Sequence, residues 1–225
     1  MLALPLLASP PLANLAFGAD GKNRPNILFM MSDDHASQAI SCYSSRINQT
    51  PNLDRIATEG IRMDRVFATN SICTPSRATV LTGKYSHLNG VPVFNRFDGS
   101  QATVAKMLQQ AGYYTAMVGK WHLGSDPTGF DYWNILPGQG VYNDPTFYDK
   151  DGSTVYKGYV TDITADLTIE ALKNRPKEKP FFMIPASRRN FATSSAIRRR
   201  SGERVIWVVP ETIFAGSPID STSTT

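Results

Sequence analysis

Cysteine is scarce in this sequence, and long apolar runs and internal repeats are missing. Its 225 residues include two cysteines, so Cys42–Cys73 is the one disulfide that could form. The apolar stretch over residues 1–26 is too short and too rich in proline to cross a bilayer. We therefore expect no membrane span.

Strong charge of one sign is also missing. The formal net charge is +4, and residues 186–225 alone hold six arginines against three acids. Because the basic excess lies largely in this terminal part, it does not indicate nucleic-acid binding, and we expect no nucleic-acid partner. With 41% hydrophobic and 19% charged residues, the composition is typical of a globular protein with one good-sized core.

The first 23 residues resemble a signal peptide, although the usual basic residues before the apolar run are absent. Leucine, alanine and proline dominate, and small residues offer a candidate cleavage point after Ala19. We expect an exported protein, periplasmic or extracellular. A start codon placed too far downstream, or a disordered leader, would explain the missing basic residues.

Strand and helix patterns alternate over residues 24–185. Residues 26–34 form an apolar run that ends in two acids, as in a strand buried on both faces of a parallel sheet. Further strands are predicted at 61–70, 113–124 and 179–184, and helices at 50–60, 74–83, 100–112 and 159–175. This alternation predicts an α/β fold with a mostly parallel or mixed sheet sandwiched by helices.

The character of the chain changes after Pro185. Residues 186–225 contain no lysine, 12 of them are serine or threonine, and "VIWVV" at 205–209 is the strongest apolar patch. This composition predicts a disordered tail. We interpret the abrupt change as a frameshift or gene-model error near Pro185.

Polar residues follow two of the predicted strands. Asp33 and Asp34 end one strand, and Lys120 and His122 follow another. Ligands of open α/β sheets bind beyond the carboxyl ends of strands, so these four residues could share one crevice. Two adjacent carboxylates suit a hard divalent cation, but they could also cap a helix or turn. Equally, Lys120 could be a solvated strand end and His122 a core residue.

Cys73 stands just before a predicted helix. The first N–H groups and the dipole of that helix favour an anion and lower the pKa of a thiol. Arg77, about one turn later, can present a planar bidentate cation to the same anion. Packing, or a disulfide with Cys42, are the alternatives for Cys73.

Other candidate residues are predicted to have supporting roles. Cys42, in "ISCYSS", fits a small buried residue. His35 and His87 are predicted to lie at the surface or behind the residues that contact a ligand.

The segment "CTPSRATVLTG" at 73–83 resembles the C-x-P-S-R and A-x-x-L-T-G motif of the type I sulfatases. Segments 24–36, 50–68 and 112–124 resemble the same family, in the family's order. The resemblance covers about residues 24–184. It implies an alkaline-phosphatase-like fold, with residues 24–185 as the N-terminal part of a sulfatase catalytic domain.

The resemblance implies a sulfuric-ester hydrolase in which Cys73 is the precursor of formylglycine. A formylglycine-generating enzyme or an anaerobic sulfatase-maturating enzyme would perform the oxidation. One oxygen of the hydrated aldehyde attacks sulfur, and the second hydroxyl later expels sulfate. The diol at Cys73 also ligates the metal.

The same resemblance assigns roles to the polar residues. Asp33 and Asp34 hold Ca²⁺, with Mg²⁺ as an alternative. Arg77 holds the diol or the metal-side carboxylates. Lys120 neutralises sulfate oxygens, and His122 acts on the diol as a base.

The substrate implied is a sulfated glycan or an aryl sulfate. The aromatic segment 129–148 falls where sulfatases contact the leaving alcohol, and it could stack on sugar rings or belong to the core. The chain looks most like bacterial sulfatases that act on N-acetylglucosamine 6-sulfate. Two alternatives are a phosphate or phosphonate monoester hydrolase of the same superfamily and a non-catalytic remnant that binds anionic glycans through Arg77 and Lys120.

The family's second half is not found in this sequence. Relatives continue with another active-site histidine, an Asp-Asn or Asp-His pair, a further lysine and a smaller C-terminal domain. Ca²⁺ takes six to eight oxygen ligands, which two carboxylates and a diol do not supply. We therefore expect the truncated chain to be poorly stable and to have little or no activity.

Overall fold

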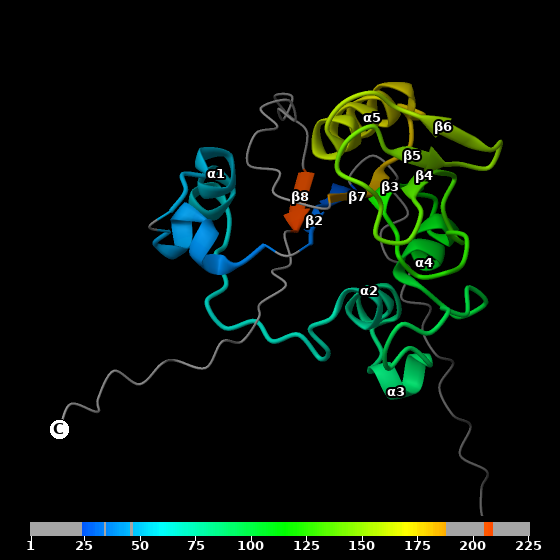
Figure 1. Ribbon diagram of the computed structural model, residues 1–225, viewed down its shortest axis with the longest axis horizontal. Coiled ribbons are helices and arrows are strands. Elements are labelled where there is room, and N and C mark those ends of the chain that lie inside the picture. The colour runs from blue at the N-terminus through cyan, green and yellow to red at the C-terminus, as the bar shows by residue number, and fades with distance from the viewer. Residues whose placement is uncertain (1–23, 34, 46, 188–204, 209–225) are drawn as a thin grey trace, which may run out of the picture.

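A central sheet organises the computed structural model, which describes residues 24–33, 35–45, 47–187 and 205–208 (Figure 1). Its strands are β1 (Asn26–Phe29), β2 (Met31–Ser32), β3 (Tyr114–Lys120), β4 (Tyr132–Leu136), β5 (Thr146–Tyr148), β6 (Ser153–Val155), β7 (Phe181–Ser187) and β8 (Val205–Val208). The order is β6-β5-β4-β3-β7-β1-β8, and β2 also pairs with β7. The predicted leader, Asp34 and most of the predicted tail lie outside the described residues.

The sheet is mostly parallel. Strands β4, β3, β7, β1 and β8 run in the same direction, whereas β5 and β6 add an antiparallel hairpin at one edge. The predicted mixed, mostly parallel sheet is therefore confirmed.

Helices cover both faces of the sheet. They are α1 (Pro51–Glu59), α2 (Cys73–Thr82), α3 (Ser86–Asn89), α4 (Val104–Gln110) and α5 (Val160–Asn174), with short 3-10 helices at Ser37–Ala39 and Ser41–Tyr43. Side chains alternate along a strand, so neighbouring residues of β7 point to opposite faces of the sheet. Phe182 and Ile184 pack with α2 and α4, whereas Met183 packs with Ala171 of α5.

The predicted helices form at nearly the predicted places. The hydroxyl of Thr103 caps α4 by accepting from the Lys106 N–H, and Gly83 ends α2 with a left-handed φ of 67°. Helix α2 begins at Cys73 itself, so Cys73 is the first helical residue and does not precede the helix. In the described part of the chain, no helix combines the length and apolarity that a bilayer crossing requires.

The predicted strand at 61–70 is wrong, because residues 61–70, all described, form neither helix nor strand. Local polar contacts hold this segment instead. The Arg62 guanidinium donates to Asp64 at 2.8 Å and to the Cys42 carbonyl oxygen at 2.6 Å. The charged residues interrupt the apolar pattern, so the segment offers no continuous apolar face to a sheet.

Part of the predicted disordered tail is a strand. Val205–Val208 pairs in parallel with the whole of β1, and β7 continues to Ser187, beyond the expected boundary at 185. The apolar β-branched run gives β1 a partner for the edge that β7 leaves open. The prediction of disorder therefore fails for these four residues.

Candidate active site

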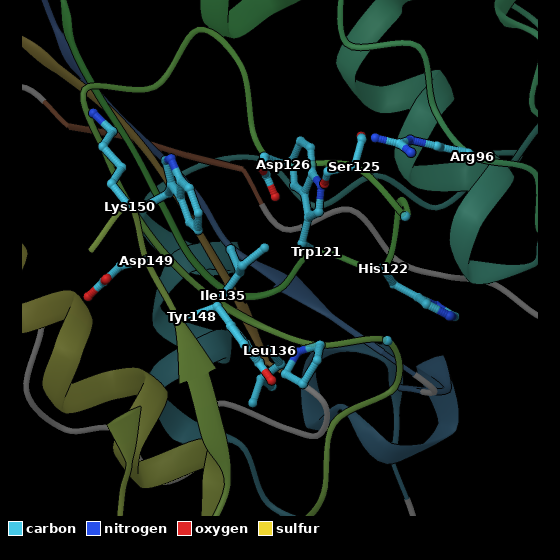
Figure 2. Close-up of a pocket in the computed structure, with 14 residues that line it drawn as sticks. Arg96, Trp121, His122, Ser125, Asp126, Ile135, Leu136, Tyr148, Asp149 and Lys150 are labelled. Atoms are coloured by element: carbon cyan, nitrogen blue, oxygen red, sulfur yellow. The ribbon is translucent and has the colours of Figure 1, made fainter. Parts of the chain in front are cut away.

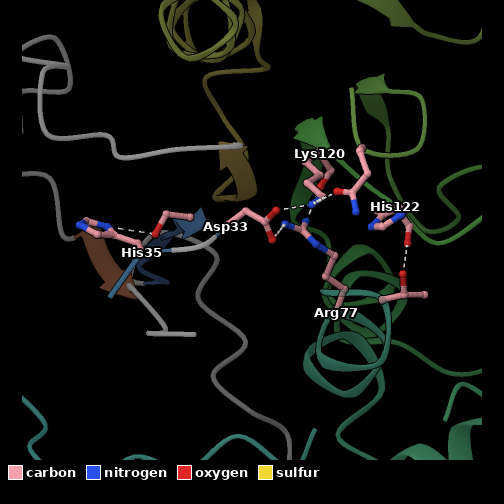
Figure 3. A network of polar contacts seen from close by, with 8 residues as sticks. Asp33, His35, Arg77, Lys120 and His122 are labelled. Carbon is pink, nitrogen blue, oxygen red and sulfur yellow. Dashed lines mark hydrogen bonds and ion pairs between the residues drawn. The ribbon is translucent and has the colours of Figure 1, made fainter. Parts of the chain in front are cut away.

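Three charged side chains converge at the carboxyl ends of β2 and β3 (Figure 3). Asp33 follows β2, Lys120 is the last residue of β3, and Arg77 lies in the second turn of α2. All three are buried, with exposed fractions of 9%, 0% and 5%. Buried charges are rare unless they are paired, so this cluster marks a specialised site.

The carboxylate of Asp33 lies between two cations. Lys120 Nζ binds Asp33 Oδ2 and also donates to Gln139 Oε1 at 2.6 Å. Arg77 Nη2 lies 3.8 Å from Asp33 Oδ1, and Arg77 Nη1 donates to the Lys120 carbonyl oxygen. Two positive charges against one negative charge leave the cluster suited to an added anion.

Strand β7 brings these residues together. The Asp33 N–H donates to the Ser187 carbonyl oxygen at 3.1 Å, and Gly119 pairs with Ala186. Gly119 has a φ of +98°, and a Cβ there would lie 2.2 Å from the Ala186 carbonyl oxygen. Only glycine permits this close approach, which places Lys120 over the end of β7.

Cys73 lies beside this cluster at the first position of α2. It is partly buried. Burial lowers the pKa of the nearby Arg77, and Asp33 and Cys73 oppose this effect. Both cysteines are free thiols, so the alternative of a Cys42–Cys73 disulfide is wrong. Cys42 is half-buried, not fully buried as predicted.

His122, which follows β3, contacts the start of α2 through a hydrogen bond. Its carbonyl oxygen accepts from the Thr74 hydroxyl at 3.0 Å, and its φ of 53° turns the chain sharply after β3. Burial lowers the pKa of His122, with Lys120 and Arg77 adding to the effect and Asp33 opposing it. Its imidazole is therefore held neutral near pH 7, which suits a proton acceptor.

The two other histidines differ from each other. His87 is exposed and stacks on Tyr85, in line with a surface position. His35 is buried, so it does not lie at the surface, and the alternative position behind the residues that contact a ligand stays a prediction. Its Nδ1 lies 3.3 Å from Ser32 Oγ, and its Nε2 has no hydrogen-bond partner among the described residues (Figure 3).

The described residues do not make a complete metal site. Asp34 lies outside them, and among them no group of three or more histidine, cysteine, aspartate or glutamate side chains could hold a metal. Asp33 is the remaining member of the predicted carboxylate pair, and Arg77 and Lys120 already contact it. One carboxylate falls far short of the six to eight oxygens that Ca²⁺ takes.

Gln139 and Thr74 are site residues that the sequence analysis missed. Gln139 follows β4, so the rule that polar residues after parallel strands share an edge would have found it once β4 was predicted. Thr74 carries no comparable signal, because its contact is to a backbone carbonyl 48 residues away in sequence.

A cavity of about 550 Å³ adjoins His122 (Figure 2). Trp133 and Tyr148, both from the aromatic segment 129–148, line it. Phe130 and Phe147 of the same segment are buried in the core. The segment therefore supplies both cavity walls and core. The core interpretation holds for Phe130 and Phe147, and stacking on sugar rings stays a prediction.

The chain is similar in sequence to known proteins. A family model described as Sulfatase matches residues 25–196. N-acetylglucosamine-6-O-sulfatase of Bacteroides thetaiotaomicron is 56% identical over 165 residues, which is 72% of this chain and 30% of that protein. Human arylsulfatase H is 42% identical over 114 residues, 45% of this chain and 20% of that protein.

Solved structures agree with the sequence matches. A structure described as a complex with its substrate D-glucosamine-2-N,6-O-disulfate superposes with a TM-score of 0.72 at 55% identity, covering 73% of this chain and 34% of that one. A complex with a neocarrahexaose, at 21% identity and a TM-score of 0.67, covers 77% of this chain and 47% of that one and shows the shared fold alone. The chain spans about 30% of the length of its bacterial relative. From its motifs, its fold and the extent of these matches, the chain belongs to the sulfatase family.

Proposed function

We propose that this chain is the N-terminal part of a catalytic domain that hydrolyses the 6-O-sulfate ester of N-acetylglucosamine or a related glycan unit. The supporting observation is geometric. Cys73 begins α2 beside the buried cations Arg77 and Lys120, in a chain 56% identical to an N-acetylglucosamine-6-O-sulfatase over 165 residues.

Each residue has a role in this proposal. Oxidation of Cys73 to formylglycine by a dedicated maturing enzyme would supply a hydrated aldehyde as the nucleophile. Arg77 and Lys120 bind the sulfate oxygens and stabilise the negative charge that develops on them. Asp33 holds both cations in place, and the neutral His122 accepts a proton from the reacting hydroxyl.

The proposal includes a metal ion, for which the chain supplies some of the ligands. Asp33 and Asp34 would contribute carboxylate oxygens to Ca²⁺. The described residues do not complete the coordination of the metal, so further oxygen ligands would be needed from outside them.

Binding of anionic glycans without turnover is the second candidate function. The pair of buried cations around one carboxylate favours it, because Arg77 and Lys120 could hold a sulfate group without any reaction.

Mass spectrometry of the tryptic peptide at 66–77 tests the proposal. After coexpression with a maturing enzyme, we expect residue 73 to lose its sulfur and to react with a hydrazide probe. Cys73→Ala is the control that cannot acquire the aldehyde. An unmodified thiol, in cells that mature another sulfatase in parallel, would contradict the formylglycine proposal. Sulfate release from N-acetylglucosamine 6-sulfate then separates turnover from binding alone.

A further inference from the structure

We propose that the cavity beside His122 binds the sugar ring adjacent to the sulfated unit, and that Arg96 recognises an anionic substituent on that ring. This inference rests on the proposed function, because the cavity is expected to extend the sulfate site along the glycan. The established family membership does not by itself assign a ligand to this cavity.

The walls of the cavity suit a sugar ring. Its volume of about 550 Å³ lies within the range of roughly 300–1,000 Å³ that is usual for small-molecule sites. Trp133, Ile135 and Leu136 of β4 supply apolar surface, and Trp121 and Tyr148 add aromatic rings. Rings with a polar edge combine apolar contact with hydrogen bonding, which fits the mixed surface of a saccharide.

Two residues of the lining each hold a buried polar atom that lacks a partner. Ser125 Oγ and His122 Nδ1 are buried and have no hydrogen-bond partner in the described part of the chain. Buried polar atoms are nearly always paired. Because solvent reaches neither atom, they belong to residues of the wall but do not face the open part of the cavity.

The charged side chains around the cavity differ in the hydrogen bonds that they already form with other described residues. Figure 2 shows Arg96 and Lys150 on opposite sides, with Trp121 and Ile135 between them. Lys150 Nζ donates to the Asp131 carbonyl oxygen at 2.9 Å, and Asp149 accepts from the N–H groups of its own turn.

Arg96 is the cation left available for a ligand. It is exposed, and within the described residues it forms no hydrogen bond or ion pair. A guanidinium binds a carboxylate or sulfate in a bidentate manner. Asp126, also on the lining, can accept hydrogen bonds from sugar hydroxyls.

His122 lies between the cavity and the charged cluster in the chain, two residues after Lys120, and it contacts the start of α2. Its side chain lines the cavity, and its carbonyl oxygen is bound by Thr74, the neighbour of Cys73. A 6-sulfate held by Arg77 and Lys120 would therefore leave the attached ring beside the opening of the cavity.

Calorimetry on the 225-residue chain tests the inference with three probes. These are glucosamine 6-sulfate, a 6-O-sulfated disaccharide whose second ring carries a carboxylate, and the same disaccharide without sulfate. We expect the sulfated disaccharide to bind about tenfold more tightly than the monosaccharide, which corresponds to about 1.4 kcal/mol. Arg96→Ala should remove this gain, whereas the matched exposed variant Arg55→Ala on α1 should preserve it.

The outcomes separate the two proposals. Equal affinity for both sulfated probes, unchanged by Arg96→Ala, would overturn the cavity proposal while sulfate recognition stands. Binding of the unsulfated disaccharide that depends on Arg96, with no preference for sulfate, would support the cavity and contradict the sulfatase function. Tyr148→Leu, at a half-exposed site, should weaken the binding of both disaccharides. No binding of any probe would overturn both proposals.

Discussion

Lys120 is fully buried, so the stability of the fold depends on the contacts that its ammonium group makes with Asp33 and Gln139. Removing one partner of a buried ion pair strands the other charge, which costs about 3–5 kcal/mol. We expect Lys120→Met to lower the free energy of unfolding by about this amount, measured by urea denaturation.

Two further variants control this experiment. Lys157→Met removes an exposed ion pair with Asp144 and should change the urea midpoint little. Adding Asp33→Asn to Lys120→Met should not recover the loss, because the buried Arg77 guanidinium then loses its carboxylate partner. Equal destabilisation by the Lys120 and Lys157 variants would contradict the buried pairing.

His122 predicts a pH dependence of stability. Its pKa lies below the ordinary 6.5, chiefly because of burial, so the folded state binds a proton less readily than the unfolded state. Stability should therefore be complete above pH 6.5 and should fall as the pH drops below it. His122→Asn, which tolerates the left-handed backbone, should flatten part of the fall in a series of thermal unfolding curves.

His35 shifts in the same direction, so it should retain part of the dependence in that variant. A parent and a His122→Asn variant with identical pH profiles would show that His122 does not contribute.

Most residues of the site could be predicted because they occupy the ends of strands and the start of a helix. Asp33, Lys120 and Arg77 meet where the sequence placed them, since parallel strands share one carboxyl edge. The contact between His35 and Ser32 could not be predicted, because no periodic pattern continues past Ser32. The direct Lys120–Asp33 contact also depends on the close approach at Gly119, which a strand pattern does not reveal.

At the scale of elements, two glycines with positive φ should respond differently to alanine. Gly119 lies inside β3, where a Cβ would meet the Ala186 carbonyl oxygen at 2.2 Å, whereas nothing lies within 4 Å of a Cβ at Gly83. We expect Gly83→Ala to cost about 1–2 kcal/mol through backbone strain alone. Gly119→Ala should separate β3 from β7 and abolish cooperative unfolding in circular dichroism melts. Similar melts for the two variants would contradict the close approach at β7.

Strand β4 and the short helix α3 were not predicted, whereas the longer helices and strands β1, β3 and β7 were predictable because each carries a clear apolar pattern and an end signal. The hairpin of β5 and β6 carries neither, since all three residues of β6 are exposed. At residues 61–70 a strand was predicted where none forms. Their apolar side chains suggest a strand, but the contact between Arg62 and Asp64 holds the segment in another conformation.

At the scale of the whole molecule, the segment after α1 presents an apolar surface. Ile61 is 80% exposed and Phe67 is 84% exposed. Exposed apolar patches promote association. We expect the chain to self-associate with rising concentration in sedimentation velocity, and Ile61→Ser with Phe67→Ser to reduce this.

Met107→Ser is the matched control, because Met107 is comparably exposed but lies on α4. An equal reduction by the control would locate the associating surface elsewhere.

Strand β7 has a consequence for the order of events during synthesis. It is the common neighbour of β1, β2 and β3, yet it is made long after them. Until residue 187 has left the ribosome, the growing chain holds early strands that have no shared partner. Sheets closed by such distant contacts assemble slowly, so in a nascent chain the early strands would wait for β7 before the sheet could close.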